Sequence, residues 1–267
     1  MSAPSPALPT ITGTTHSAPH RILLINPNGT PSMTKACLSS LAPTLPADVE
    51  VTGFTTPHPT PSAIEGHVDG VLSAAAALRS ILPISKNYDA FLVACFSAHP
   101  LINALREEVE GPVIGIMEAS FYASRMLGGR LGVVATGERS KVMHEDAIRG
   151  YGFEGFSAGV ETSGLGVLDL ERRDRAEVLG KVGEAAKRLV EGKGADCVCL
   201  GCAGMTDMRR RCEEVVGTRD GKVMVVDGVG IGVQFLVGLV RERLRTAKGG
   251  VFRSAAEGRR ARGQDWV

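Results

Sequence analysis

The chain has 267 residues, of which 43% are hydrophobic and 22% are charged, the mix of an ordinary globular protein rather than a disordered one. Its 30 Lys and Arg residues balance 29 Asp and Glu residues, so the formal net charge is +1. This balance gives no overall positive field that would attract a nucleic acid, and at about 150 residues per domain the length predicts one large domain or two small ones.

The two ends of the chain are expected to lie outside the folded body. Residues 1–20 are rich in Ser, Thr, Pro and Ala and lack the features of a signal peptide, so they are predicted to form a disordered tail. Residues 255–267 contain Arg259, Arg260 and Arg262 and are predicted to form a flexible basic tail. Without a secretory signal the expected compartment is the cytoplasm, where the six cysteines stay reduced.

Apolar runs typical of buried strands alternate with helical stretches along the body of the chain. The expected strands cover residues 21–25, 50–54, 89–94, 113–117, 130–135, 196–200 and 223–226. The expected helices cover residues 31–41, 64–82, 100–109, 119–127, 138–150, 173–191, 205–216 and 232–246. This alternation predicts an α/β fold in which helices flank parallel sheets.

The most apolar stretch, residues 223–240, raises the question of a membrane span. Asp227, Gln234 and several glycines interrupt it. A membrane-spanning helix avoids a carboxylate in its middle, so the stretch is predicted to form a strand, a turn and a buried helix, and no membrane partner is expected.

Two cysteines occupy equivalent places in the two halves of the chain. Cys95 follows the strand in DAFLVACFSA, and Cys202 follows the strand in DCVCLGCAGM. Ligands bind at the carboxyl ends of parallel strands, and a helix N-terminus nearby favours the thiolate form of a cysteine. Two such thiols on opposite sides of a substrate can invert a stereocentre, because one removes a proton from carbon while the other delivers a proton to the opposite face.

Several segments resemble the Asp/Glu/hydantoin racemase superfamily and, within it, the hydantoin and allantoin racemase branch in its fungal form. These segments are ILLINPNGT, PSAIEG, ACFSAHPL around Cys95, GPVIGIMEAS, LGVVATG, LGCAGM around Cys202 and VVDGVG. The resemblance implies two pseudo-symmetric lobes, each a parallel sheet flanked by helices, with the active site in the cleft between them. The implied lobe 1 covers residues 21–117 and 218–254, and the implied lobe 2 covers residues 118–217.

The resemblance also implies a cofactor-independent racemase in which Cys95 and Cys202 exchange the C5 proton of a 5-substituted hydantoin or of allantoin. It further implies a homo-oligomer whose partner is a small-molecule substrate, with no cofactor and no metal. By family analogy and local chemistry, the predicted substrate-binding residues are Asn26, Ile64, Phe96, Ser97, Thr136, Ala203 and Gly204.

One position departs from the bacterial members, which tend to have Asp-Pro where this chain has His99-Pro100. The His-Pro form resembles fungal members linked to allantoin use, which favours a ureide or hydantoin over a free amino acid. The simpler interpretation of His99 is a helix-start residue. Asn26 and Thr136 also have simpler interpretations, as a turn residue and a helix cap.

Other functions stay open at this point. An isomerase or decarboxylase of a small dicarboxylic acid is possible within the superfamily, although decarboxylase relatives keep only the second cysteine. Such a substrate would also favour a pocket that is cationic or dense in amide groups, and the residues predicted for the cleft include no Lys or Arg. A non-catalytic ligand-binding protein on the same fold is a third hypothesis, which the presence of both cysteines disfavours.

A metal site is the alternative for the cysteine-rich segment around Cys202. Cys197, Cys199, Cys202 and Cys212 lack Cys-x-x-Cys pairs and a nearby histidine. Cys197 and Cys199 share one face of an expected buried strand, so core packing is the better explanation for both.

Overall fold

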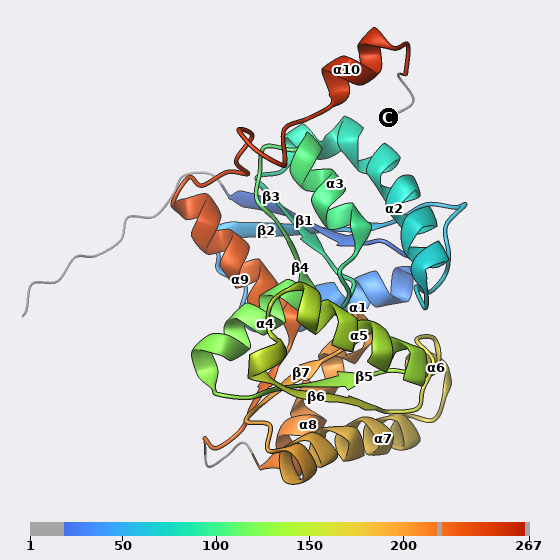
Figure 1. The fold of residues 1–267 in the computed structure, drawn as a ribbon, viewed down its shortest axis with the longest axis vertical. Helices are drawn as coiled ribbons and strands as arrows, with labels where there is room; N and C mark the ends of the chain where they lie inside the picture. Colours follow the sequence, from blue (N-terminus) through green and yellow to red (C-terminus); the bar gives the residue numbers. More distant parts are fainter. Residues whose placement is uncertain (1–18, 218–220, 265–267) are drawn as a thin grey trace, which may run out of the picture.

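The computed structural model describes residues 19–217 and 221–264, and it contains two four-stranded sheets in which every strand pair is parallel (Figure 1). Helices lie on the faces of both sheets, so the predicted two-lobed α/β architecture is confirmed. Residues 1–18, most of the expected N-terminal tail, lie outside the described part of the chain, as do residues 265–267.

The first sheet is built from the N-terminal part of the chain, in the order β2-β1-β3-β4. Its central strand β3 is buried at every residue, as expected for a parallel strand covered on both faces. The strands are β1 (His20–Asn26), β2 (Val49–Thr55), β3 (Ala90–Val93) and β4 (Val113–Gly115). The helices that follow them include α1 (Pro31–Leu41), α2 (His67–Ile81), continued by the 3-10 helix η1 (Leu82–Asn87), and α3 (Pro100–Glu108).

The second sheet repeats the topology of the first, with the order β6-β5-β7-β8. In each sheet the first strand in the chain lies between the second and the third, so the two lobes are pseudo-symmetric. The strands are β5 (Leu131–Ala135), β6 (Ser157–Thr162), β7 (Cys197–Leu200) and β8 (Met224–Val226). The helical elements are α5 (Glu138–Gly150), η2 (Glu154–Phe156), α6 (Asp169–Arg172), α7 (Arg175–Lys187), the π-helix η3 (Arg188–Gly192), the 3-10 helix η4 (Ala203–Met208) and α8 (Arg209–Val216).

Two neighbouring helices carry the chain between the lobes. Helix α4 (Ile116–Leu127) follows β4 and packs against the second sheet, whereas α9 (Gly228–Arg241) follows β8 and returns to the first sheet. The two helices pack against each other, and a side chain at Gly228 would collide with the backbone carbonyl of Ile116. Glycine is therefore required at the start of α9 for this close approach.

The core has three parts that follow from this arrangement. One cluster lies between the sheets and joins inner-face residues of both lobes to α4, α5 and α9. A second cluster packs α2 and α3 on the outer face of the first sheet, and a third packs α7 and α8 on the outer face of the second. The lobes therefore share a hydrophobic interior in addition to having separate outer layers.

Three expectations differ from the observed fold. The strand at residues 223–226 was expected in lobe 1, but β8 pairs with β7 in the second sheet, so the return to lobe 1 begins only at α9. The strand β6 was not predicted, because it lies at a sheet edge and only Val160 is fully buried. The helix expected from residue 64 begins at His67, which leaves Ile64 in the preceding loop.

The C-terminal segment is ordered against lobe 1 rather than forming the expected flexible tail. Residues 256–261 form the short helix α10 (Ala256–Ala261). Arg259 makes an ion pair with Glu108 at the end of α3, and Lys248 Nζ donates to the backbone carbonyl of Glu107 at 2.9 Å. These charged contacts explain why the basic segment does not extend freely into solvent.

One continuous helical stretch in the described residues, 67–87, is long and apolar enough in length and composition to cross a membrane. In this fold it packs against α3, with Ala74, Ala77 and Ile81 in the core.

Candidate active site

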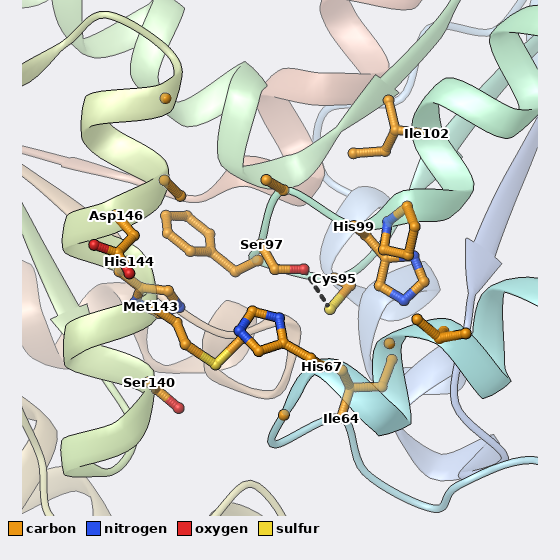
Figure 2. Close-up of a pocket in the computed structure, with 18 of the residues that line it drawn as sticks. Ile64, His67, Cys95, Ser97, His99, Ile102, Ser140, Met143, His144 and Asp146 are labelled. Atoms are coloured by element: carbon orange, nitrogen blue, oxygen red, sulfur yellow. Dashed lines mark hydrogen bonds between the residues drawn. The ribbon is translucent and has the colours of Figure 1, made fainter.

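Cys95 lies two residues beyond β3, at the carboxyl end of the first sheet. Its side chain is half-buried, and its Sγ lies 3.2 Å from Ser97 Oγ (Figure 2). Burial raises the pKa of the Cys95 thiol to about 11, and the hydrogen bond with Ser97 opposes that rise. Ser97 was predicted to bind substrate; in this structure its hydroxyl interacts with the thiol.

Cys202 lies two residues beyond β7, at the equivalent place in the second sheet. It is the N-cap residue of η4, and its Sγ accepts a hydrogen bond from the Gly204 N–H at 3.4 Å. Burial, together with the charges of Cys95, Glu171 and Glu65, raises the pKa of Cys202 to about 12. Because Cys95 contributes to this shift, the two thiols lie within electrostatic reach of each other.

The expectation that a helix terminus would favour both thiolates is wrong for this structure. Cys95 does not cap α3, since His99 does, and the helix begun by Cys202 is a six-residue 3-10 helix. Desolvation penalises the charged form of a thiol and outweighs these local donors. Since burial raises the pKa values of Cys95 and Cys202 to about 11 and about 12, both thiols are protonated at neutral pH.

The remaining four cysteines are fully buried free thiols. Cys199 Sγ lies 3.2 Å from Ser124 Oγ, and Cys197 Sγ lies 3.6 Å from the Ser124 carbonyl oxygen. Both side chains therefore face α4 from β7, as core packing predicts. Within the described ranges 19–217 and 221–264, no three His, Cys, Asp or Glu side chains are grouped to hold a metal ion.

A cavity of about 630 Å³ opens beside Cys95, between the two lobes (Figure 2). Lobe 1 lines one side with the loop at Ile64 and with residues 95–106, and α5 of lobe 2 lines the other. Among the predicted site residues, those lining the cavity are Ile64, Cys95, Phe96 and Ser97. Those outside its lining are Asn26, Thr136, Cys202, Ala203 and Gly204.

The predicted residues outside the cavity lie at the strand ends around it. Asn26 is buried, and its Nδ2 donates within its own loop and α1, to acceptors that include Asn28 Oδ1 and the Thr30 carbonyl, both at 3.0 Å. This geometry matches the turn-stabilising interpretation of Asn26. Thr136 follows β5, and its hydroxyl donates to Ser140 Oγ at 2.9 Å. A substrate role for either residue stays a prediction.

His99 is the N-cap residue of α3, in agreement with its interpretation as a helix-start residue. Its Nδ1 accepts a hydrogen bond from the Leu101 N–H at 3.2 Å, and its Nε2 lies 3.1 Å from Ser73 Oγ. Burial lowers the pKa of His99 to about 4, so the ring is neutral at physiological pH. Since Nδ1 is an acceptor, the single ring proton is on Nε2 and points to Ser73.

Several cavity residues were missed in the sequence. On the side of lobe 1 they include His67 of α2. On the side of lobe 2 they come from α5, which begins after the carboxyl end of β5 and lies opposite Cys95; the ones used below are Ser140, Met143 and His144. The sequence could have indicated the residues of α5, because the helix that carries them follows the end of a predicted strand, where ligands bind. Arg106, which was not among the residues predicted for the cleft, also lines the cavity, and its guanidinium is 2.8 Å from Glu118.

Polar contacts hold the lobes together at the rim of the cleft. Ser32 Oγ donates to Glu171 Oε2 at 2.7 Å, and the Val167 N–H donates to Glu65 Oε1 at 3.0 Å. Glu171 and Glu65 are the same carboxylates that raise the pKa of Cys202. The two carboxylates that link the lobes therefore also favour the protonated form of Cys202.

Comparison with known proteins gives a consistent result. The profile of the Asp/Glu/Hydantoin racemase family matches residues 22–236. An uncharacterized protein of Schizosaccharomyces pombe is 40% identical over 235 residues, covering 88% of this chain and 98% of that protein. A hydantoin racemase of Pseudomonas sp. strain NS671 is 35% identical over 231 residues, covering 85% of this chain and 89% of the relative. The solved structure of allantoin racemase from Klebsiella pneumoniae aligns with a TM-score of 0.81 at 30% identity, covering 88% of this chain and 93% of that one.

Proposed function

Because the chain belongs to the Asp/Glu/hydantoin racemase family, we propose that it is a cofactor-independent racemase of a 5-substituted hydantoin or of allantoin. The observation that carries this proposal is the pair of half-buried thiols, Cys95 and Cys202, at equivalent strand ends of two repeated sheets. The two thiols are within electrostatic reach of each other, and Cys95 borders a cavity of substrate size. We further propose that the enzyme acts in the cytoplasm and that it is a homo-oligomer, as the family resemblance implies for the oligomeric state.

In the proposed reaction one cysteine acts as thiolate and the other as thiol. The thiolate takes the C5 proton of the substrate, and the electron pair left on carbon is delocalised onto the adjacent C4 carbonyl oxygen. The second cysteine then gives its proton to the opposite face of C5, so the stereocentre is inverted and no atom is gained or lost. The two cysteines end the turnover with their protonation states exchanged, and proton exchange with solvent restores them.

The environments of the thiols suggest which cysteine ionises first. Burial raises the pKa of Cys95 to about 11 and that of Cys202 to about 12, and the charges of Glu171 and Glu65 contribute to the rise at Cys202. A single negative charge is therefore more stable on Cys95, with Ser97 Oγ as its donor. Cys95 is the proposed base and Cys202 the proposed acid in the more abundant form of the active enzyme.

The cavity supports an uncharged substrate over a small dicarboxylic acid. A dicarboxylate favours an unpaired cation or a dense set of amide donors, and Arg106, which lines the cavity, is already held by Glu118 and by the Val113 carbonyl at 2.9 Å. A hydantoin ring is uncharged in the ground state, so it does not require a free cation in the cavity.

The test is racemisation of enantiopure allantoin and 5-alkyl hydantoins, followed by circular dichroism. Cys95→Ala and Cys202→Ala should each lower the rate by about 10³-fold or more, because each removes a general acid or base. Cys212→Ala is the control, since this thiol belongs to the buried face of α8, and it should retain activity. Retained activity in either of the first two variants would contradict the two-thiol mechanism.

Serine variants separate the two half-reactions. Cys95→Ser and Cys202→Ser keep the shape of the site but replace one thiol by a much weaker acid. Each should lose racemisation while still exchanging the C5 proton of one enantiomer with deuterium oxide, as observed by proton NMR. Equal exchange of both enantiomers in both variants would argue against one thiol on each face.

A further inference from the structure

His144 on α5 carries a buried ring nitrogen with no protein partner. The side chain is 5% exposed and lines the cavity beside Cys95. Its ring packs edge-on against Phe96, with the ring centroids 5.3 Å apart. His144 Nδ1 has no hydrogen-bond partner in the structure. A buried polar atom without a partner is uncommon in native proteins and calls for an explanation.

The protonation of His144 defines what that nitrogen can do. Burial lowers the pKa of His144 to about 4, whereas a hydrogen bond with the backbone of Phe96 acts to raise it. We assign the single N–H of the neutral imidazole to Nε2, because Nδ1 has no acceptor to receive it. The other nitrogen, Nδ1, is then a hydrogen-bond acceptor that awaits a donor.

Four other polar residues that line the cavity have hydrogen-bond partners within the protein: Ser97, His99, Ser140 and Arg106. Ser97 interacts with Cys95, and both ring nitrogens of His99 are used. Ser140 accepts from Thr136, and Arg106 is held by Glu118. Against this background, the acceptor on His144 is a recognition element that the fold itself does not use.

The position of His144 relates it to the substituent on C5 of the substrate. In the proposed reaction C5 lies beside Cys95, and the cavity extends from Cys95 between the lobes to α5 (Figure 2). The C5 substituent is the part of a hydantoin that varies, and this cavity provides the space for it. His144 Nδ1 is closed to solvent in the ligand-free protein, and Met143, an unbranched side chain lining the same cavity, is a flexible neighbour that can shift to admit a ligand.

We propose that His144 is a specificity-determining residue that accepts a hydrogen bond from an N–H group on the C5 substituent. The preferred substrate class is then a hydantoin with a ureido or similar amide-bearing arm, rather than one with a purely alkyl arm. This inference rests on the proposed function, because it requires C5 of a hydantoin to be beside Cys95.

A matched pair of substrates tests the inference. Allantoin has a ureido arm, and 5-isobutylhydantoin has an arm with the same number of heavy atoms and the same branching but no N–H. The wild-type protein should prefer allantoin. His144→Leu should lower kcat/KM for allantoin by about 3- to 10-fold, mainly through KM, as expected for one lost hydrogen bond, and should leave 5-isobutylhydantoin within about twofold.

Two further variants serve as controls. His144→Asn places an amide oxygen near the position of Nδ1 and should recover most of the preference for allantoin. Val142→Ala changes an exposed neighbour on the same helix and should alter neither substrate. Thermal unfolding of each variant checks that the fold is retained.

Several outcomes would overturn the inference. An equal loss for both substrates in His144→Leu would assign the residue a structural role, and no loss for either would show that Nδ1 does not contact the arm. If His144→Leu fails to fold, a wild-type preference for 5-isobutylhydantoin overturns the inference by itself. If the wild-type protein racemises neither compound, both the proposed function and the inference are contradicted. If the wild-type protein racemises them and the His144 variants do so equally well, only the inference is contradicted.

Discussion

The two lobes have the same strand order, yet they hold their thiols in different ways. In lobe 1, Cys95 lies in a loop ahead of α3 and interacts with a side-chain hydroxyl, that of Ser97. In lobe 2, Cys202 begins the helix η4 and accepts from a backbone N–H, that of Gly204. Repetition of the fold therefore provides a pair of equivalent positions, and local contacts make the two positions chemically unequal. A proton-transfer pair needs both properties, because one group must ionise before the other.

The largest effect expected from this inequality is on the pH profile. Burial raises the pKa of Cys95 to about 11 and that of Cys202 to about 12, so the required thiolate is scarce at neutral pH and becomes more abundant as the pH rises. We expect kcat/KM to increase about tenfold per pH unit between about pH 6 and pH 9. The rate with Cys95→Ala at each pH measures the uncatalysed racemisation and is subtracted. A flat profile would mean that the thiols are not the titrating groups.

The contact that distinguishes Cys95 can be removed directly. Ser97→Ala deletes the donor to the Cys95 thiolate, so the pKa of Cys95 should rise towards that of Cys202 and the rate at neutral pH should fall by about 3- to 10-fold. Ser97→Thr keeps a hydroxyl and is the matched control. The measurement is the pH dependence of thiol alkylation by iodoacetamide, with the modified cysteine identified by mass spectrometry. If Cys202 of the wild-type protein is alkylated at lower pH than Cys95, the assignment of base and acid is reversed.

The contact between α4 and α9, which connects the lobes, is expected to affect catalysis least, and changing it should alter the stability of the fold. Gly228→Ala should lower the free energy of unfolding by about 1–3 kcal/mol, because the added methyl group meets the Ile116 carbonyl and forces α4 and α9 apart. Gly238→Ala, on the same helix with open space around it, should be neutral or slightly stabilising. Urea unfolding followed by circular dichroism compares the two. Equal stability of both variants would indicate that the α4–α9 contact adapts without cost.

Much of the fold was predictable because its strands are continuous buried apolar runs. The helix at residues 31–41 was predicted with its observed bounds, since a proline at its start and a strand-ending turn before it are local signals. The strand β6 was not predicted, because an edge strand that contains Gly159 and Glu161 lacks such a run. The position of β8 in the second sheet also depends on pairing, which a local apolar run does not encode.

In the candidate site too, features set by the local sequence were predictable, whereas features set by tertiary structure were not. The positions of Cys95 and Cys202 follow from strand ends, which the sequence reveals. Their pKa values do not, because the helix terminus is a local feature whereas burial depends on the assembled lobes. The contribution of α5 and of His144 to the cavity likewise exists only once the second lobe faces the first.

The return of α9 to the first sheet has a consequence for synthesis on the ribosome. The N-terminal sheet receives its inner covering from Val229, Val233 and Leu236, which are translated after every strand of the second sheet. The C-terminal lobe can therefore complete its sheet first, although domains usually mature from the N-terminus during translation. Until α9 emerges, the inner apolar face around Leu24 and Leu92 lacks this cover, and a nascent chain stalled before residue 228 should be a substrate for chaperones.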